Sequence, residues 1–314
     1  MNEEELIVKV ANMYYKQDMD LKEVGKIFNV SYATISRLLK KGREMGIIRI
    51  FINSQSNSTN ELELELKKAF KVNEVFAINV QHSDAPDIIK NLVAIEAANY
   101  LSSILKDCDI LGISWGSTIY NVVNNFRNNR RINVDVIQLN GNFSAIPIEL
   151  NSLDLTRRMK NMFTGSYYFI NSETIVENEK IKEILINDTN IKKTFLLHKS
   201  VNVALLGIGA FNSKSISNLY EDYLKADEIE ELENFNVVGE CHHIFFDING
   251  KIFDSKIKKR AISIEKKDLF KIKNKIVVIS GIEKTSAIIG AMRANLVDIL
   301  FIDSLTLENI INKI

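Results

Sequence analysis

The sequence feature that most restricts the fold is an alternation of short apolar runs and longer amphipathic stretches, which starts near residue 74. The short runs are rich in Val, Ile, Leu and Phe, as buried strands are, and the stretches between them carry apolar residues at helical spacing. Repeated β-α units predict a parallel sheet with helices on both faces, because a crossover must return the chain to the start of each next strand. The predicted strands are residues 75–80, 109–114, 134–139, 167–170, 201–206, 275–280 and 297–302, and the predicted helices are residues 61–71, 88–105, 118–126, 153–163, 175–186, 191–197, 286–294 and 305–311.

The first fifty residues carry a different pattern. Residues 20–43 read DLKEVGKIFNVSYATISRLLKKGR and predict two short helices joined by a turn at Asn29 and Val30. Ser31 suits the N-cap of the second helix, because its hydroxyl can accept a backbone N–H that the first helical turn leaves unpaired. Together with a supporting helix at residues 3–16 and a wing strand at residues 47–52, these elements predict a winged helix-turn-helix.

The outer face of the second helix and the wing carry side chains that suit a DNA major groove. Hydroxyls and arginine can meet base edges, and lysines can meet phosphates. A surface αα-hairpin with a solvated basic face is the plainer alternative, but the turn, the cap and the apolar spacing coincide as a helix-turn-helix requires. The candidate DNA-binding residues are Ser31, Tyr32, Thr34, Ser36, Arg37, Lys40, Lys41 and Arg49.

Length, linker composition and charge divide the chain into two domains. Its 314 residues are too many for a helix-turn-helix alone and enough for one small domain and one large one. Residues 53–60, NSQSNSTN, are polar, uncharged and aperiodic, so they predict a linker between a DNA-binding domain at residues 1–52 and a second domain at residues 61–314. The formal net charge of +0 argues against a protein coated in cations for general nucleic-acid binding.

Several classes of protein are not expected. Two cysteines, Cys108 and Cys241, cannot build a disulfide framework. His242 and His243 are adjacent, and on a strand they would point to opposite faces, so we expect no metal site. The first residues are acidic and polar, and no apolar run approaches the ~20 residues that span a bilayer, so we expect a cytoplasmic protein without a membrane partner.

The stretch ILGISWGSTIY at residues 110–120 predicts an anion site. An apolar strand runs into Gly116, Ser117 and Thr118, which open a helix. Glycine lets the backbone approach a ligand closely, and the free N–H groups and dipole of a helix N-terminus favour an anion, most naturally a phosphate. An ordinary helix start without a ligand is the alternative, but the position directly after a buried strand of an α/β domain favours an anion site.

Other strand-end loops are expected to converge on the same cleft, because open α/β sheets bind ligands beyond the carboxyl ends of their strands. Lys284 can neutralise a phosphate, and Glu240 and Asp303 can accept hydrogen bonds from sugar hydroxyls. Taken singly, these residues can equally be caps or solvated charges. Together they have the composition of a sugar-phosphate pocket, to which the loops contribute Asn140, Gly141, Glu240, Lys284 and Asp303.

Taken in order, several motifs resemble the SorC family of bacterial sugar-binding transcriptional regulators, and the resemblance extends over nearly the whole chain. The motifs are SYATISRLL at residues 31–39 followed by Gly46-Ile47, GISWGST at residues 112–118, VIQLNG at residues 136–141, Gly239-Glu240 followed by FFDING at residues 245–250, and Ser280-Gly281 with Lys284, Ala287-Ile288 and LFID at residues 300–303.

This resemblance implies that the large domain has the Rossmann-like parallel-sheet fold of sugar-phosphate isomerases and deaminases, used for sensing and not for turnover. It implies a phosphorylated sugar as effector, no cofactor, and a homo-oligomer, commonly a tetramer, whose affinity for operator DNA changes when the effector binds. The site residues that it implies are Gly116, Ser117, Thr118 and Lys284 for the phosphate, Glu240 for the sugar, and Asn151 as a looser match to a polar pocket position.

Asn140 departs from the family. Some members carry at this position a lysine that forms a Schiff base with a sugar phosphate, and others carry an arginine. Asparagine has no amine nucleophile, so covalent capture is excluded here, and the effector is expected to differ and to bind non-covalently. Gly25 and Gly42 stand where the family has alanines, which is expected to loosen the DNA-binding domain, and Tyr32 stands where arginine is common.

The sequence therefore predicts a DNA-binding transcriptional regulator of carbohydrate metabolism that is controlled by a phosphorylated sugar, and not an enzyme. Two alternatives stay open. One is a sugar-phosphate isomerase or deaminase with an attached DNA-binding domain, in which Glu240 or Asp303 would act as the base; because no convincing acid–base pair is visible, no catalytic residue is assigned. The other is an architectural DNA-binder whose large domain only oligomerises.

Overall fold

The computed structural model describes residues 3–17, 19–44, 48, 57–128, 130–211 and 223–314. These residues belong to two compact units, which divide the chain after residue 54. Each unit has a hydrophobic core of its own.

The described part of the N-terminal unit contains three helices, α1 (Glu3–Lys16), α2 (Leu21–Phe28) and α3 (Tyr32–Glu44). They match the three helices that apolar spacing predicted. Ile48 follows α3, and its N–H donates to the carbonyl of Gly42 at 2.9 Å. The rest of the predicted wing, residues 47 and 49–52, lies outside the described residues. The core of the unit consists of Ile7, Val10, Val24, Ile35, Leu38, Leu39 and Ile48.

Caps hold both ends of α2. The carboxylate of Asp20 accepts two backbone N–H groups of the first turn of α2, at 2.7 and 2.8 Å, and that of Glu23 accepts the N–H of Asp20 at 3.0 Å. The helix ends at Asn29, whose φ of +54° is left-handed. A Cβ on Gly25 would lie 2.7 Å from the carbonyl oxygen of Val30. Gly25 is therefore required for the tight turn, and the expectation that it loosens the unit is wrong.

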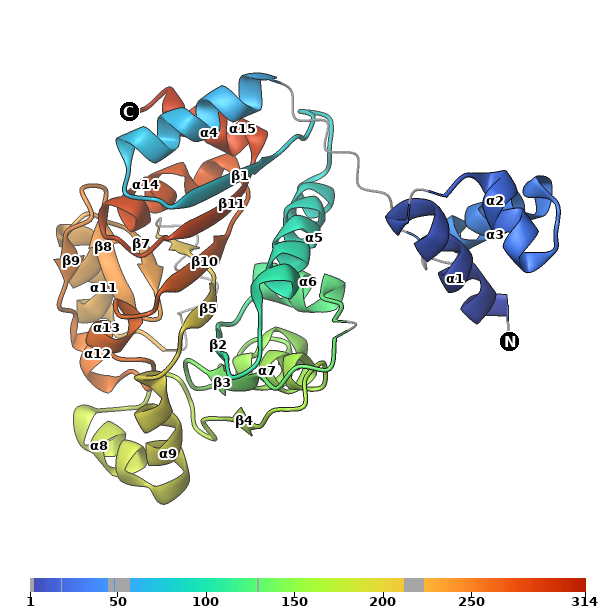
Figure 1. The fold of residues 1–314 in the computed structure, drawn as a ribbon. Helices are drawn as coiled ribbons and strands as arrows, with labels where there is room; N and C mark the ends of the chain where they lie inside the picture. Colours follow the sequence, from blue (N-terminus) through green and yellow to red (C-terminus); the bar gives the residue numbers. More distant parts are fainter. Residues whose placement is uncertain (1–2, 18, 45–47, 49–56, 129, 212–222) are drawn as a thin grey trace. The chain divides into compact units, whose positions relative to one another are not determined.

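In the C-terminal unit, seven of the described strands form a parallel sheet in the order β1-β11-β10-β5-β2-β3-β4 (Figure 1). Every neighbouring pair in this sheet is parallel. The predicted fold class is confirmed, with each predicted strand present in shorter form or with shifted ends. The strands are β1 (Glu74–Ile78), β2 (Ile110–Ile113), β3 (Asp135–Gln138), β4 (Tyr167–Tyr168), β5 (Val203–Leu206), β10 (Asn274–Val278) and β11 (Ile299–Asp303).

Helices cover both faces of this sheet. Along β5, Val203 and Leu205 face one core while Ala204 and Leu206 face the other, because successive side chains of a strand point to opposite faces. One face packs against α5 (Pro86–Ile104), α6 (Ser117–Asn125) and α7 (Ser152–Lys160). The other packs against α4 (Asn57–Ala69), α14 (Thr285–Arg293) and α15 (Ser304–Ile311).

The start of α4 corrects the predicted linker. Residues 57–60 form the first turn of this helix, so the assignment of residues 53–60 to a linker is wrong for its second half. Residues 53–56 lie outside the described part of the chain. The polar composition of these residues misled the prediction, because a helix N-terminus is also rich in Asn, Ser and Thr.

A second sheet was not predicted from the sequence. Four of the described strands pair antiparallel in the order β6-β7-β8-β9, namely β6 (Gly209–Ala210), β7 (Val237–Cys241), β8 (Ile244–Asp247) and β9 (Ile252–Phe253). β6 follows β5 after only two residues, so this small sheet adjoins the carboxyl end of the parallel sheet. Glu240 lies on β7, and its predicted place in a loop of the parallel sheet is wrong.

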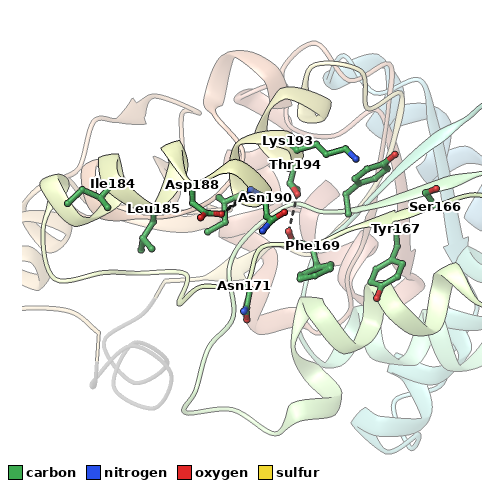
Figure 2. A pocket seen from close by; sticks show the side chains of 12 residues that line it. Ser166, Tyr167, Phe169, Asn171, Ile184, Leu185, Asp188, Asn190, Lys193 and Thr194 are labelled. Carbon is green, nitrogen blue, oxygen red and sulfur yellow. Dashed lines mark hydrogen bonds between the residues drawn. The ribbon is translucent and has the colours of Figure 1, made fainter.

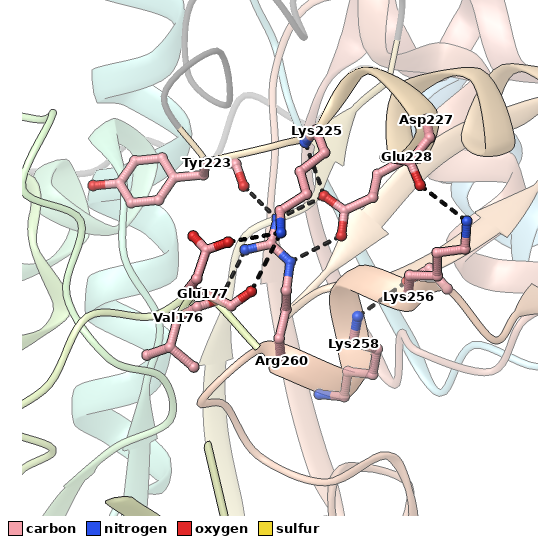
Figure 3. A network of polar contacts seen from close by, with 10 residues as sticks. Val176, Glu177, Tyr223, Lys225, Asp227, Glu228, Lys256, Lys258 and Arg260 are labelled. Atoms are coloured by element: carbon pink, nitrogen blue, oxygen red, sulfur yellow. Dashed lines mark hydrogen bonds and ion pairs between the residues drawn. The ribbon is translucent and has the colours of Figure 1, made fainter. Parts of the chain in front are cut away.

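Shorter elements complete the unit. A buried Arg260 on α12 joins α11 to the loop before α8 by contacts to Glu228, Val176 and Tyr223 (Figure 3). No helix among the described residues has the length and apolar character that crossing a bilayer needs. The remaining elements are α8 (Glu179–Asn187), α9 (Thr189–His198), α11 (Ala226–Asn234), α12 (Lys256–Arg260), α13 (Lys266–Leu269) and the 3₁₀ helices η1 (Ile148–Leu150) and η2 (Ile282–Lys284).

Candidate functional site

A cleft of about 310 Å³ lies at the carboxyl ends of β2, β5 and β10. These three strands are neighbours in the parallel sheet, so the loops that follow them meet at one edge. The small sheet supplies another wall. The described lining consists of residues 114–118 after β2, residues 207–211 after β5, Lys284 after β10, Ile146 and Leu150 near η1, and Glu240 and His242 from the β7–β8 hairpin.

The N-terminus of α6 opens into this cleft. Gly116 has a φ of +102°, which an L side chain rarely adopts, and a Cβ placed there would meet no atom within 4 Å. Its own N–H donates to the carbonyl of Leu150 at 2.9 Å. The donors left for a ligand are therefore the N–H groups and hydroxyls of Ser117 and Thr118 in the first turn. The arrangement is that of an anion site at a helix N-terminus.

Lys284 brings a positive charge to the same cleft. It ends the 3₁₀ helix that follows β10, and its side chain is partly buried. Burial lowers the pKa of its ammonium because the charge loses water; Glu283 opposes this shift, and Lys90 adds to it. An anion beside Lys284 would replace the lost hydration, so this lysine is suited to neutralise a bound phosphate.

Glu240 brings a carboxylate to the wall formed by the small sheet. It is 7% exposed and pairs across the strands with Gly209, where a Cβ would lie 2.6 Å from its Oε1 atom. Gly209 therefore leaves room for the carboxylate to lie against the backbone. One carboxylate oxygen accepts the N–H of His243 at 3.0 Å, which holds the side chain while it borders the cleft.

Four of the predicted site residues lie outside the lining of the cleft. Asp303 is the N-cap of α15: it is 2% exposed, and its carboxylate accepts bonds from the N–H of Gly281 at 3.1 Å and from the N–H and hydroxyl of Thr306 at 2.8 and 2.6 Å. Asn151 is bonded in both directions to the backbone of Phe143, at 2.8 and 3.0 Å. Both residues shape loops near the cleft and do not face a ligand.

Asn140 and Gly141 are the other two. Asn140 is fully buried, and its amide donates to the carbonyl of Gly141 at 2.7 Å. The N–H of Gly141 donates to the carbonyl of Ile262 at 2.8 Å, and a Cβ there would lie 2.7 Å from the backbone of Glu173. The segment after β3 therefore packs against the segments at Glu173 and Ile262 and does not face the cleft. Of the predicted effector-binding residues, the ones that line the cleft are Gly116, Ser117, Thr118, Glu240 and Lys284.

Sequence reasoning missed the apolar part of the lining and one polar residue. Trp115, Ile208 and Phe211 give the cleft apolar walls, and His242 joins Glu240 beside it. The histidine pair was considered only as metal ligands on a strand, but both residues lie in a turn. The described His, Cys, Asp and Glu residues form no group of three or more that could hold a metal ion.

A larger hollow of about 780 Å³ lies along β4 and helices α8 and α9 (Figure 2). Its wall includes the rings of Tyr167 and Phe169, and its cation, Lys193, lies 5.2 Å from the centre of the Tyr168 ring. The nearby N-terminus of α9 is already occupied, because the carboxylate of Asp188 accepts two N–H groups of its first turn at 3.0 and 3.4 Å. Among the described residues, this hollow therefore offers no free helix N-terminus to an anion, and the smaller cleft is the stronger candidate for a binding site.

In the N-terminal unit, α3 presents the predicted DNA-binding face. The N–H of Thr34 donates to the Ser31 hydroxyl at 3.2 Å, so the predicted N-cap is confirmed. Tyr32 is 60% exposed, and Ser31, Ser36, Arg37, Lys40 and Lys41 are exposed as well, whereas Thr34 is half-buried. Arg49 lies outside the described residues. One helix face thus carries hydroxyl, aromatic and cationic groups that are accessible to a duplex.

Comparisons with known proteins found relatives that match nearly the whole chain. A family described as "Putative sugar-binding domain" matches residues 54–312. The chain is 26% identical over 313 residues to the deoxyribonucleoside regulator of Bacillus subtilis (strain 168), covering 99% of this chain and 98% of that protein. It is 29% identical over 307 residues to the sorbitol operon regulator of Klebsiella pneumoniae, covering 96% of each. The solved structure of the full-length sorbitol operon regulator from that organism superposes with a TM-score of 0.83 at 26% identity, covering 99% of each chain.

Proposed function

The chain belongs to the SorC family of sugar-binding transcriptional regulators, and from this premise we propose that it binds operator DNA through α3 and changes its affinity for that DNA when a phosphorylated sugar occupies the cleft. The effector binds without a covalent bond. Two relatives of the chain are named a deoxyribonucleoside regulator and a sorbitol operon regulator, which supports a role in carbohydrate metabolism.

The observation that carries the proposal is the charge arrangement in the cleft. The free first turn of α6 at Ser117 and Thr118, together with the ammonium of Lys284, favours an anion with several oxygens. Glu240, on the small antiparallel sheet, can accept hydrogen bonds that sugar hydroxyls donate. A phosphorylated sugar has both chemistries in one molecule of suitable size.

Sensing is favoured over turnover by the state of the polar groups. An isomerase or deaminase needs an acid or base whose pKa lies near the working pH. In the described lining, the carboxylate of Glu240 is held by a backbone N–H, and burial and neighbouring charges lower the pKa of His242 to about 3. The imidazole of His242 is therefore not suited to exchange a proton at neutral pH.

We also propose that the working form is a homo-oligomer, commonly a tetramer in this family, whose helix-turn-helix units bind the two halves of an operator. Paired recognition helices match operators with half-sites about one helical turn apart. Light scattering on the purified full-length protein tests this part, and a monomer at working concentrations would contradict it.

The proposal as a whole is tested with the full-length chain and fluorescent DNA from upstream of its own operon. Fluorescence anisotropy is expected to show specific, salt-sensitive binding whose affinity shifts when sugar phosphates are added. The unfolding temperature is expected to rise when the same compounds are added, because a ligand that binds only the folded state stabilises it.

Lys284→Met tests the cleft directly. This variant is expected to lose about tenfold or more in effector affinity by calorimetry, which corresponds to about 1.4 kcal/mol. Lys267→Met on α13 is the matched control, because Lys267 is exposed and does not line the cleft. Equal effector affinity in Lys284→Met and the parent protein would remove Lys284 from the site. Absence of specific DNA binding under every effector condition would contradict the proposed function as a transcriptional regulator.

A further inference from the structure

The outer edge of β4 lacks the features that usually protect the edge of a sheet. In the order β1-β11-β10-β5-β2-β3-β4, this strand pairs with β3 alone among the described strands. Exposed edges are commonly protected by charged side chains or proline, because their unpaired backbone groups can otherwise pair with another chain. Residues 166–170 read SYYFI and contain neither. We therefore expect this edge to be covered in the working protein.

Aromatic and aliphatic side chains line the hollow of about 780 Å³ beside this edge (Figure 2). The rings of Tyr167 and Phe169 stack with 5.6 Å between their centres, although these residues are 41% and 40% exposed. Ile184 on α8, at the opposite end of the hollow in Figure 2, is 71% exposed. Apolar side chains that gather on a surface mark interaction sites, and tyrosine and phenylalanine are enriched in protein–protein interfaces. The hollow therefore has the composition of a protein-binding surface.

Contacts between its own walls fix the shape of this hollow. The hydroxyl of Thr194, on α9, donates to the carbonyl of Phe169 at 2.9 Å. Ile191, one turn earlier on α9, packs in a small buried core with Ile170 and Ile262. Because these contacts join α9 to the chain after β4, the exposed rings keep their positions without a partner. Association through this surface then loses little side-chain entropy.

The hollow carries one charge of each sign, and neither is neutralised within the described part of the chain. The Oδ1 atom of Asp188 accepts two N–H groups of α9, whereas its Oδ2 atom has no partner among the described residues. The ammonium of Lys193 lies 5.2 Å from the centre of the Tyr168 ring and pairs with no described carboxylate. A partner that fits the hollow therefore brings a cation to Asp188 and an anion to Lys193.

A second copy of the same chain has this charge pattern. Two copies related by a twofold axis meet through the same surface, so every contact between two different residues occurs twice. Such an axis can bring Lys193 of each copy to Asp188 of the other, and the stacked rings of each copy to Ile184 of the other. A partner with a different sequence would need both charges and the apolar groups in matching places. Charge complementarity thus favours a second copy as the occupant.

We propose that the hollow along β4, α8 and α9 is a twofold interface between two copies of the chain, in which Lys193 of each copy pairs with Asp188 of the other. This inference rests on the homo-oligomer of the proposed function, and it names a surface that holds the oligomer together. The interface uses none of the residues that line the cleft at the carboxyl ends of β2, β5 and β10. Two copies that are joined in this way therefore keep both clefts available.

Sedimentation velocity of the full-length protein over a dilution series tests the apolar part of the interface. Ile184→Asp is expected to weaken self-association by about tenfold or more, because the new carboxylate would be buried without a partner. Ile148→Asp is the matched control, because Ile148 is 76% exposed and lies outside the hollow, and it is expected to keep the parent assembly. Both isoleucines are exposed, so circular dichroism is expected to show that both variants remain folded.

A charge reversal tests the pairing across the axis. Lys193→Glu is expected to weaken self-association by about tenfold, because it places two carboxylates opposite each other. Adding Asp188→Asn to this variant is expected to recover most of the loss, because asparagine removes the repulsion and still caps α9.

The outcomes separate this inference from the proposed oligomer. If the parent protein is an oligomer and both Ile184→Asp and Lys193→Glu assemble as it does, the inference alone is overturned. A different protein that occupies the hollow while these variants still self-associate normally would overturn it as well. A parent protein that stays a monomer at working concentrations would overturn the proposed oligomer together with this interface.

Discussion

Replacing Arg260 with alanine is expected to destabilise the C-terminal unit by about 4 kcal/mol. The guanidinium is 9% exposed and the carboxylate of Glu228 is 4% exposed. Two nitrogens of Arg260 bond the two oxygens of Glu228 at 2.8 and 2.6 Å (Figure 3). Removing one partner of such a buried pair typically costs about 3–5 kcal/mol, because the other charge stays buried without compensation.

The other bonds of Arg260 place the expected value in the middle of that range. The guanidinium also donates to the carbonyl of Val176 at 2.8 Å and to that of Tyr223. Each lost bond adds about 1 kcal/mol at most, since water can reach part of these sites in the variant. The backbone N–H of Lys225 donates to Glu228 at 2.9 Å and still compensates some of the carboxylate charge, which reduces the loss.

Urea unfolding of the full-length protein measures this loss. Trp115 is the only tryptophan in the sequence and packs 4.4 Å from the ring of Phe143 in the C-terminal unit, so its fluorescence reports on that unit. Lys256→Ala is the matched control: Lys256 pairs with Asp227 at 3.0 Å, but both side chains are exposed, and no measurable change is expected. If Arg260→Ala shifts the unfolding midpoint no more than this control, the reasoning from burial is refuted.

A double variant separates charge from packing. Arg260→Met with Glu228→Leu removes both charges and keeps apolar volume, so it is expected to recover most of the stability lost by Arg260→Ala. Burial raises the pKa of Glu228, but the bonds from Arg260 outweigh this effect and lower it overall. A carboxyl group whose pKa is lowered in the folded state stabilises the protein at neutral pH. This contribution is expected to be lost as the pH falls through the acid range, and Arg260→Met with Glu228→Leu should show less of that loss.

Four further outcomes are expected. Arg37→Ala should weaken operator binding by about 1–3 kcal/mol in anisotropy assays at fixed salt, as for a bidentate base contact, and an unchanged Kd would show that the recognition helix is oriented differently. Ser31→Ala should destabilise the N-terminal unit by about 1 kcal/mol in thermal unfolding, because the first turn of α3 loses its cap. Gly209→Ala should weaken effector binding severalfold in calorimetry, because a Cβ 2.6 Å from Oε1 must displace the carboxylate of Glu240. The stability of the C-terminal unit should fall as the pH is lowered from about 6.5 toward 4, because burial lowers the pKa of His198 to about 4 and the unfolded chain takes up the proton first. His198 alone contributes about 1.4 kcal/mol per pH unit, and His242, whose pKa is lowered to about 3, adds to this slope. Urea midpoints that stay constant over this range would contradict the prediction.

Local sequence determined the elements whose signals lie within a few residues. The turn and cap around Ser31 need only a small hydroxyl residue before an apolar helix, and the structure has that N-cap bond. Continuous apolar runs predict the parallel sheet, because its central strands are buried on both faces. The anion site at Gly116, Ser117 and Thr118 could also be predicted, because the strand, the glycine and the helix start follow one another in the chain.

Tertiary structure decided which polar residues face the cleft. Asp303 and Asn151 have the chemistry of sugar ligands. Asp303, however, caps α15 and also accepts the N–H of Gly281, and Asn151 bonds to the backbone of Phe143. The cap of α15 is a local signal, but the contacts to Gly281 and Phe143 join separate segments and no local pattern reveals them. The small sheet escaped prediction because β6 and β9 have only two residues each and no helix separates β7, β8 and β9, so the alternation of strand and helix that indicates the parallel sheet is missing there. His242 comes to line the cleft only through that sheet, because the pairing of Cys241 with Ile244 places it in the turn between β7 and β8.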